Sequence, residues 1–440
     1  MGATGGRFDR SASGPAMTRS IRPVGRSDTK FVLGMVSGGH FVSHVYLLAF
    51  PPLFPLLGAE FDLSTSQLGL LVTAIYVPQL VLQLPLGDLV DRVGAKRVLV
   101  AGIAVTALGI ALAGLATSYP LLLACAFVSG IGQSVFHPAD YALLDTVAGD
   151  DAEGLAFGVH TFGGFAGSAA APVVIGGAGL RFGWEIALLA VGAFGFVYAA
   201  ALHLTTAPVH ARRIASDAAE DGEKGVDDGS DEDSSGASPF GALSLVRRPD
   251  MLLVFAFYFA SMTAIVGVQS FATVFAIESY GFAESTANTV LTAYLVCTAV
   301  GVLVGGVLAD RVRFEPIIVG AFCLSAACLW FATAAVSGAS LAVALAVFSI
   351  VGLAMGTALP ARDTFANSFV DPGTAGKRFG FFFTGLSLGA VVSPAVLGAV
   401  IDARSTAVAF ALVGVVLVLA ASIVVVARFE LRSRATTVAE

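Results

Sequence analysis

The sequence predicts an all-α integral membrane protein whose twelve transmembrane helices form two pseudo-symmetric six-helix bundles. Of its 440 residues, 56% are hydrophobic and only 12% are charged, about half the charged share of an average soluble domain. A spanning helix needs about 20 apolar residues, so the chain has enough of them for twelve spans. This composition excludes a soluble globular domain, a disordered chain and a disulfide-rich scaffold.

The spans are apolar runs separated by short polar turns, and they fall into two groups of six. A basic tail at 1–30 precedes the first group, which occupies 31–204 and has spans at 31–57, 67–87, 98–117, 120–143, 154–178 and 184–204. The first run is too long for the apolar core of a signal peptide. The second group occupies 250–428, with spans at 250–277, 288–308, 316–335, 340–360, 378–401 and 406–427, and a tail at 429–440 follows it.

The segment between the two groups, 205–249, is rich in Asp, Glu, Gly and Ser. This composition is typical of a solvated linker. All but two of the 24 Lys and Arg residues lie in the tails, in the linker and in the turns on the same side of the membrane; the exceptions are Arg181 and Arg404. Because Lys and Arg are concentrated in cytoplasmic loops, we expect both termini and the linker to be cytoplasmic.

An internal repeat relates the two groups of spans. Shifting residues 130–176 by 222 positions aligns Gly130 with Gly352 and Pro138 with Pro360 without a gap. The same shift aligns further glycines and a second pair of prolines. Parallel six-span repeats are typical of secondary transporters that alternate access by rocking one half against the other.

A charged turn recurs after the second span of each half. It reads GDLVDR at residues 87–92 and GVLADR at residues 306–311. Glycine allows helices to approach closely, and Asp and Arg can pair with neighbouring helix ends. These turns resemble the signature of the major facilitator superfamily, which is Gly-x-Leu-Ala-Asp-Arg in each half.

This resemblance implies the major facilitator fold and a cytoplasmic latch in the outward-facing state. The latch residues are Gly87, Asp91 and Arg92 in the first half and Gly306, Asp310 and Arg311 in the second. Ala95 stands where the superfamily usually has an arginine, so the charge network is expected to run through Lys96 or Arg97.

Span five also resembles a superfamily pattern, the antiporter motif, in which glycines and a proline bend this span against span eight. The matching residues are Gly158, Gly167, Pro172 and Gly176, and span eleven repeats the frame with Gly380, Gly389, Pro394 and Gly398. The resemblance favours export over import. A general packing role is the alternative, because small residues are common at helix interfaces in membranes.

Span four lacks the buried arginine of many proton-coupled superfamily members. Residues 126–132 read AFVSGIG, without that arginine. Phe136, His137 and Pro138 follow, and this element is similar to one in fosmidomycin-resistance-type exporters and in some sugar-phosphate or organic-anion carriers.

Polar side chains inside spans are costly, so they are functional candidates by default. Histidine can change its charge near neutral pH and could couple a solute to protons. Hydrogen bonding between helices is the alternative role. The residues expected in a central substrate or coupling cavity are His44, Gln79, Gln83, Gln133, His137, His160, Gln269 and Tyr294. Arg362, beside Pro360, is either a contact for an anionic substrate or a topology anchor.

Two acids at the inner ends of spans are expected to act as gate partners. Asp140 lies about 30 Å from the outer end of span four, which places it near the cytoplasmic surface within reach of Arg92. Asp363 is expected to pair with Arg311 in the second half. His40 and His44 have the spacing of metal ligands on one helix. No acids or cysteines are clustered near them in the sequence, so no metal site is predicted.

We expect a secondary active transporter that moves a small solute across the cytoplasmic membrane by alternating access, with ion-gradient-driven efflux of an amphiphilic or anionic compound favoured. Proton- or sodium-coupled uptake of an organic anion or sugar phosphate is the alternative. A receptor or sensor with a transporter fold is an alternative of another class. The chain has no phosphate-binding loop, nucleophile elbow or His-Glu-x-x-His helix, so neither enzyme activity nor a cofactor is expected. The expected partners are the solute, a proton or sodium ion and membrane lipid, without nucleic acid, and the expected state is a monomer.

Overall fold

The computed structural model describes residues 26–148, 153–221, 245–335, 339–370 and 375–439. Every regular element in these ranges is helical, and twelve helices are long and apolar enough to cross a membrane. The predicted all-α fold with twelve spans is therefore confirmed. Most of the acidic linker and the basic N-terminal tail lie outside the described residues.

The described part of the first half consists of eleven helical elements, several of which share a span: α1 (Arg26–Leu47), η1 (Pro51–Leu53), α2 (Phe54–Phe61), α3 (Thr65–Val93), α4 (Ala95–Ala113), α5 (Tyr119–Gln133), α6 (Phe136–Ala148), α7 (Glu153–Ala171), η2 (Pro172–Gly176), α8 (Gly177–Phe182) and α9 (Trp184–Asp221). The second half has longer, mostly unbroken helices: η3 (Leu245–Arg247), α11 (Pro249–Tyr280), α12 (Glu284–Ala309), α13 (Phe314–Ala334), α14 (Leu341–Asn367), α15 (Ala375–Ala403) and α16 (Thr406–Ala439).

Two helices run further than the hydropathy pattern predicts. The helix α9 continues to Asp221 instead of ending at 204, and α16 continues to Ala439. The added residues include many Ala, Arg and Glu, which are strong helix formers, so helix propensity carries these helices past the apolar stretch.

Three spans of the first half are interrupted. Span one bends at Pro51 and Pro52, and span four breaks between α5 and α6 at Ser134 and Val135. Span five changes to π-helical geometry at Pro172. Proline removes one backbone donor and crowds the preceding turn, so bends at these positions are expected.

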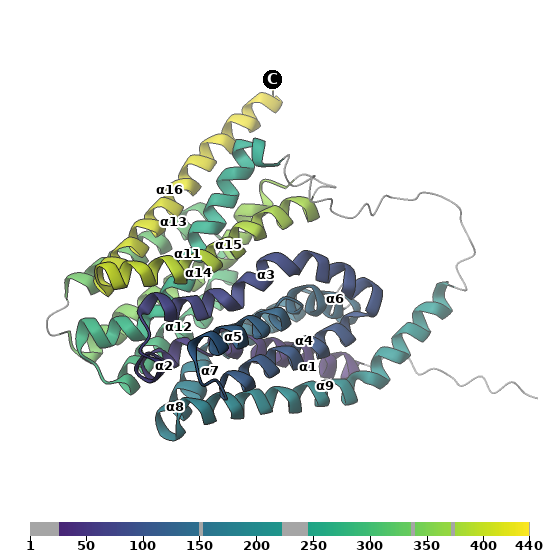
Figure 1. The fold of residues 1–440 in the computed structure, drawn as a ribbon. Helices are drawn as coiled ribbons and strands as arrows, with labels where there is room; N and C mark the ends of the chain where they lie inside the picture. The colour runs from purple at the N-terminus through teal and green to yellow at the C-terminus, as the bar shows by residue number, and fades with distance from the viewer. Residues whose placement is uncertain (1–25, 149–152, 222–244, 336–338, 371–374, 440) are drawn as a thin grey trace, which may run out of the picture.

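The two halves are splayed toward one side of the molecule. We call this the basic side, because the α3–α4 turn with Arg92 and Arg97 and the α12–α13 turn with Arg311 and Arg313 lie there. The opposite end is the distal side. The bundles meet at the distal side and diverge toward the basic side, where α9 and α16 end (Figure 1).

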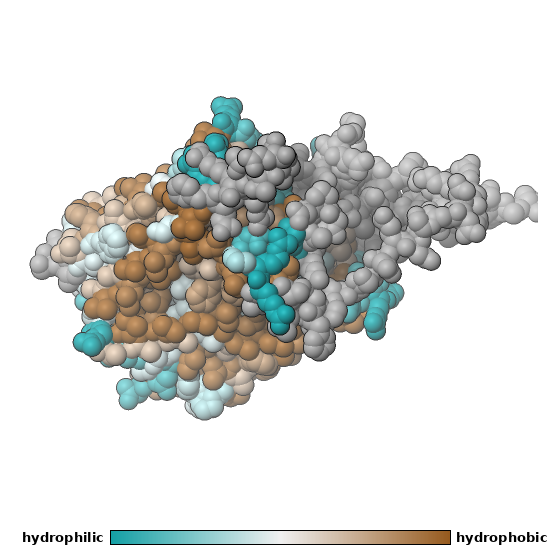
Figure 2. All heavy atoms as spheres, turned by 90° about the horizontal axis from the view of Figure 1, so that it is seen from above, coloured by the Kyte–Doolittle hydropathy of each residue, from teal (hydrophilic) through white to brown (hydrophobic). Residues whose placement is uncertain are grey.

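The outer surface of the bundles is apolar. Large side chains such as Val197 and Leu204 are more than half exposed, and Figure 2 shows an extensive hydrophobic surface with hydrophilic residues toward its margins. Exposed apolar surface on this scale fits a helix bundle whose solvent is lipid.

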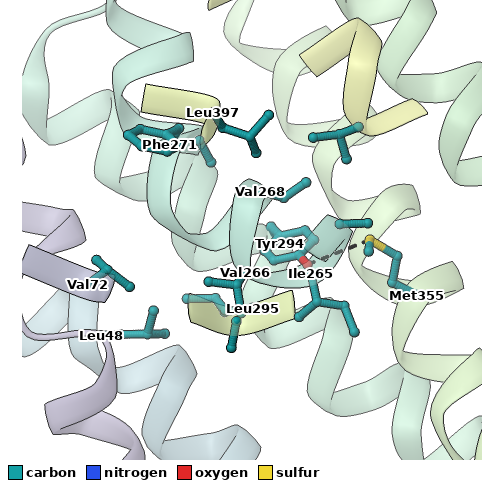
Figure 3. Close-up of a cluster of buried hydrophobic side chains, with 14 of the residues drawn as sticks. Leu48, Val72, Ile265, Val266, Val268, Phe271, Tyr294, Leu295, Met355 and Leu397 are labelled. Atoms are coloured by element: carbon teal, nitrogen blue, oxygen red, sulfur yellow. Dashed lines mark hydrogen bonds between the residues drawn. The ribbon is translucent and has the colours of Figure 1, made fainter. Parts of the chain in front are cut away.

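Two seams join the bundles, and the internal repeat relates them. The helix α3 packs against α15, and α7 with η2 packs against α12. These are spans two and eleven in one seam and spans eight and five in the other. Figure 3 shows part of the intervening core, where Leu48 and Val72 of the first half face Ile265, Val266 and Phe271 of the second.

Candidate functional site

A cavity of about 490 Å³ lies between the two halves. Its walls come from α1, α3, α6 and α7 on one side and from α11, α14 and α15 on the other. Apolar side chains make up most of the wall: Leu47, Leu48, Phe165, Met262, Ile265, Leu359, Phe383, Leu386 and Ala390. Five of the residues predicted to lie in a central cavity do line it: His44, Gln79, Gln83, His137 and Gln269.

The other three predicted cavity residues do not line this space. Gln133 is 3% exposed and bridges two helices: its Oε1 accepts from Ser43 Oγ at 2.7 Å and its Nε2 donates to the Ser43 carbonyl at 2.7 Å. Tyr294 is fully buried against Met355 between α12 and α14 (Figure 3). His160 is buried behind the cavity wall. For Gln133 and Tyr294 the helix-bridging alternative is the observed role.

Arg362 brings a positive charge to the cavity wall. Its Nε donates to Asp363 Oδ1 at 3.0 Å, and its guanidinium lies 5.0 Å from the centre of the Tyr258 ring. The Tyr258 hydroxyl donates to the same carboxylate oxygen at 3.1 Å. The side chain of Arg362 is only 13% exposed. These contacts hold the guanidinium in one orientation facing the cavity.

The predicted pairing of Asp363 with Arg311 is not made in this conformation. Asp363 contacts Arg362 and Tyr258, whereas Arg311 is exposed in the turn after α12. Asp363 pairs with Arg362 instead, because Arg362 is the adjacent residue on the same helix and its guanidinium is within hydrogen-bonding distance. Arg362 lines the cavity, as expected for a contact with an anionic substrate, and its side chain is largely buried.

Behind the cavity wall of the first half, Asp140 lies among histidines. Its Oδ2 shares a hydrogen bond with His40 Nδ1 at 3.2 Å and lies 3.6 Å from His160 Nε2. One nitrogen each of His40 and His160 and one carboxylate oxygen of Asp140 lie within 4.8 Å of one another, and all three residues are buried. Two further histidines adjoin this group. The centre of the His44 ring lies 4.6 Å from that of His40, and the centre of the His137 ring lies 5.8 Å from it.

The position of Asp140 corrects two predictions. It does not contact Arg92, which is exposed in the α3–α4 region, and the histidines of span one do have an acid beside them. The expected depth of Asp140 holds only if span four is one straight helix, but the chain breaks between Gln133 and Phe136. His40 itself lies about 15 Å along α1 from Lys30, so Asp140 sits at membrane depth and not at the surface.

The latch turns are disengaged in this conformation. Asp91, Arg92, Asp310 and Arg311 are exposed, and a Cβ on Gly87 or Gly306 would meet nothing within 4 Å. Close helix packing at these two glycines is not observed. The resemblance in sequence places such a latch in the outward-facing state, and here the bundles are apart on the basic side.

The glycines of the predicted packing motif in spans five and eleven fall into two groups, those in close helix contacts and those without any. Gly167 lies against the Phe41 backbone of α1, and Gly176 lies against Asn288 of α12. Their counterparts Gly389 and Gly398 pack on α11 and on the start of α3, whereas Gly158 and Gly380 face open space. In both halves the later glycines of this frame pack closely against other helices, with Pro172 and Pro394 between them, which agrees with the packing alternative.

The distal side is closed by hydrogen bonds between the halves. Asp402, near the end of α15, accepts from Thr65 N at 2.8 Å and from Ser66 N at 2.9 Å, at the first turn of α3. Deeper in the same seam, Thr73 Oγ1 donates to the Val391 carbonyl at 2.8 Å. In the other seam, Asn288 Nδ2 donates to the Pro52 carbonyl at 3.2 Å.

Replacing Asp402 by alanine is expected to open the α3–α15 seam more often. The carboxylate caps the α3 N-terminus only while the distal side is closed, and such exposed charge-assisted bonds contribute about 1 kcal/mol, roughly fivefold in the equilibrium. The measurement is maleimide labelling of Thr73→Cys from the distal side, with the four natural cysteines replaced by alanine. Glu60→Ala, which replaces an exposed acid on α2, is the control. Equal labelling rates in Asp402→Ala and its parent would show that Asp402 does not hold the seam.

A two-bundle membrane protein with a solute-sized cavity, closed on one side and splayed on the other, is a transporter in its architecture. The sequence profile of the Major Facilitator Superfamily matches residues 36–283 and 255–440. The chain belongs to this superfamily.

Named relatives cover most of the chain. An uncharacterized MFS-type transporter, YfnC of Bacillus subtilis (strain 168), is 27% identical over 83% of this chain and 85% of its own length. The fosmidomycin resistance protein of Escherichia coli (strain K12) is 25% identical over 89% and 93%. The crystal structure of a bacterial homolog to the human lysosomal transporter Spinster, in an inward-facing and occupied conformation, superposes with a TM-score of 0.74 at 17% identity, over 92% of this chain and 97% of that one. This last likeness concerns the fold.

Proposed function

We propose that the protein is a secondary active transporter that exports a small amphiphilic organic anion across the cytoplasmic membrane, driven by an ion gradient. The observation that carries this proposal is Arg362, a guanidinium fixed in the wall of an otherwise largely apolar cavity. No Asp or Glu is among the residues that line this cavity. A ligand with one anionic group and an apolar body would satisfy both parts of the wall.

The size of the cavity supports a small solute. Binding sites for small molecules are typically about 300–1,000 Å³ and mostly apolar, with a few polar groups that set orientation. The amides of Gln79, Gln83 and Gln269 and the imidazoles of His44 and His137 would supply those polar groups. Arg362 would take the negative end of the solute.

Alternating access supplies the transport step. The distal seams are closed by Asp402 and Asn288 while the basic side is splayed. The Lys and Arg bias supports a cytoplasmic position of the basic side, and in that orientation this state would take up solute from inside the cell. Export is favoured by the relative named for fosmidomycin resistance.

Flux in proteoliposomes tests the proposal. Vesicles containing the purified protein are loaded with fosmidomycin, a phosphonic acid, or with glucose 6-phosphate, and proton and sodium gradients are imposed separately. Gradient-dependent exit of fosmidomycin that protein-free vesicles do not show is the expected result. In a second set of vesicles, with either anion outside and none inside, gradient-driven entry without gradient-driven exit in the first set would reverse the direction to uptake. Flux of neutral solutes without flux of anions would refute the substrate class.

A further inference from the structure

We propose that Asp140, with His40 and His160, binds the proton whose movement drives transport. This rests on the proposed function and deepens it, because it selects the proton as the coupling ion and separates its site from the solute cavity. The site lies between α1, α6 and α7, within the first half alone.

The hydrogen bonding of the group is incomplete. Asp140 is fully buried, and its Oδ1 has no hydrogen-bond partner. His160 is 1% exposed, and neither of its ring nitrogens has a hydrogen-bond partner. A buried carboxylate with a single bond to an imidazole is poorly compensated as an anion. One added proton would neutralise the carboxylate, and it could then be shared with either neighbouring ring.

A path connects this group to the cavity. His40 stacks on His160 at 4.0 Å between ring centres and adjoins His44 and His137. Those two histidines line the cavity, and the His44 Nδ1 lies 3.0 Å from Ser168 Oγ. Chains of acidic and histidine side chains within membranes are typical proton relays. In the present conformation the relay would exchange protons with the splayed, basic side.

The chemistry of the donors favours a proton over a metal ion or sodium. Sodium, like other hard cations, requires several oxygen ligands, and this group offers one carboxylate and imidazole nitrogens. A transition metal accepts imidazole, but its ligand lone pairs must converge on one point. The rings of His40 and His160 are stacked, with 4.0 Å between their centres and only 30° between their planes, so their nitrogen lone pairs lie in two nearly parallel planes and would not meet at one ion unless a ring turned. A proton needs only one donor and one acceptor at a time.

The other described titratable and charged groups near Asp140 do not supply a permanent positive charge to its carboxylate. Tyr141 on α6 is partly exposed toward the cavity, and Tyr198 on α9, which interacts electrostatically with Asp140, donates its hydroxyl proton to the Met35 carbonyl at 2.7 Å. The neighbouring helices α3 and α4 carry their charges at the basic side: Asp88, Asp91, Arg92 and Arg97 are exposed, and Lys96 donates to the His203 carbonyl. None of the described contacts of Asp140 is to a permanent cation.

The internal repeat gives the two ionic groups corresponding places. The shift of 222 positions that aligns Pro138 with Pro360 also aligns Asp140 with Arg362. In the second half α14 is continuous there and Arg362 lines the cavity, whereas in the first half the chain breaks before α6 and Asp140 faces α1 and α7. One half thus supplies the proton site and the other the anion site.

Two measurements on the reconstituted protein test this proposal, with Asp140→Asn as the main variant. The first needs no solute: infrared difference spectra between acid and alkaline buffers should contain a carboxylic-acid carbonyl band that Asp140→Asn removes. The second uses fosmidomycin: the acceleration of its flux by a proton gradient should be lost in Asp140→Asn, while exchange of labelled for unlabelled fosmidomycin persists. His160→Gln should shift the carbonyl band. Asp62→Asn, an exposed acid on the distal side, should leave both readouts unchanged.

Three outcomes would contradict the proton site or the proposed function. A carbonyl band and proton-driven flux that survive in Asp140→Asn would overturn the assignment. Stoichiometric Zn²⁺ binding by the purified protein that Asp140→Asn abolishes would also overturn it, in favour of a metal site. Absence of fosmidomycin flux in the unmodified protein would count against the proposed function, while the infrared titration of Asp140 would still decide the proton site.

Discussion

Replacing Arg362 by glutamine should reduce anion transport about a hundredfold in kcat/KM, because losing one partner of a charge pair between protein and solute inside a largely apolar cavity costs about 3 kcal/mol. The guanidinium is held by Asp363 and the Tyr258 ring, so it is already oriented before the solute arrives. Arg362→Lys should recover only part of the activity, because lysine keeps the charge but loses the planar contact with Tyr258. The measurement is concentration-dependent flux of fosmidomycin in proteoliposomes.

The matched control for Arg362 is Arg404→Gln. Arg404 belongs to the same half, but it is exposed on the distal side, between α15 and α16. It should transport like the unmodified protein. If Arg362→Gln had an unchanged KM for fosmidomycin, the guanidinium would not be the anion contact and the substrate class proposed from it would fail.

The second large effect is expected from a single glycine at the α12–α14 contact. A Cβ on Gly305 would lie 2.4 Å from the Thr357 carbonyl oxygen, and that atom belongs to the backbone of a packed helix. Gly305→Val would therefore force the two helices apart. Overpacking of this kind costs about 1–3 kcal/mol and sometimes more, so we expect low yield and a clearly lower Tm in detergent.

The neighbouring glycine provides the control within the same helix. A Cβ on Gly306 would meet nothing within 4 Å. Both variants exchange a glycine of α12 for valine, so the change in helix propensity is the same in the two. Gly306→Val should keep the Tm of the unmodified protein in the same detergent. Equal melting temperatures for the two variants would mean that close approach at Gly305 does not stabilise the bundle.

Several features of this protein could be predicted without coordinates because they are local properties of the chain. The number of spans follows from the length of apolar runs, and the two halves follow from a constant shift between aligned glycines and prolines. Polar groups within a span are costly unless they have a role, so the sequence predicts His44, Gln83 and His137 as cavity residues. The structure places all three in the cavity wall.

Other features depend on how helices break and pack, and no local pattern reports that. Gln133 has the same polarity and spacing as His137, yet it bonds to Ser43 inside the first half. Asp402 looks like an ordinary acid at the end of a span, and only the neighbouring α3 N-terminus reveals its role. The role of Asp140 could have been suspected from the repeat, which aligns it with Arg362.

The sequence by itself determined the membrane class, the twelve spans, the two related halves and the superfamily signature, because hydropathy and repeat spacing are properties of the chain that do not depend on tertiary contacts. Only the tertiary structure decided the partners of the few charged groups in the membrane. The break between α5 and α6 turns Asp140 toward His40 and His160, whereas the unbroken α14 leaves Arg362 in the cavity. A buried charge takes its chemistry from its immediate neighbours, and those neighbours lie on helices far apart in the sequence.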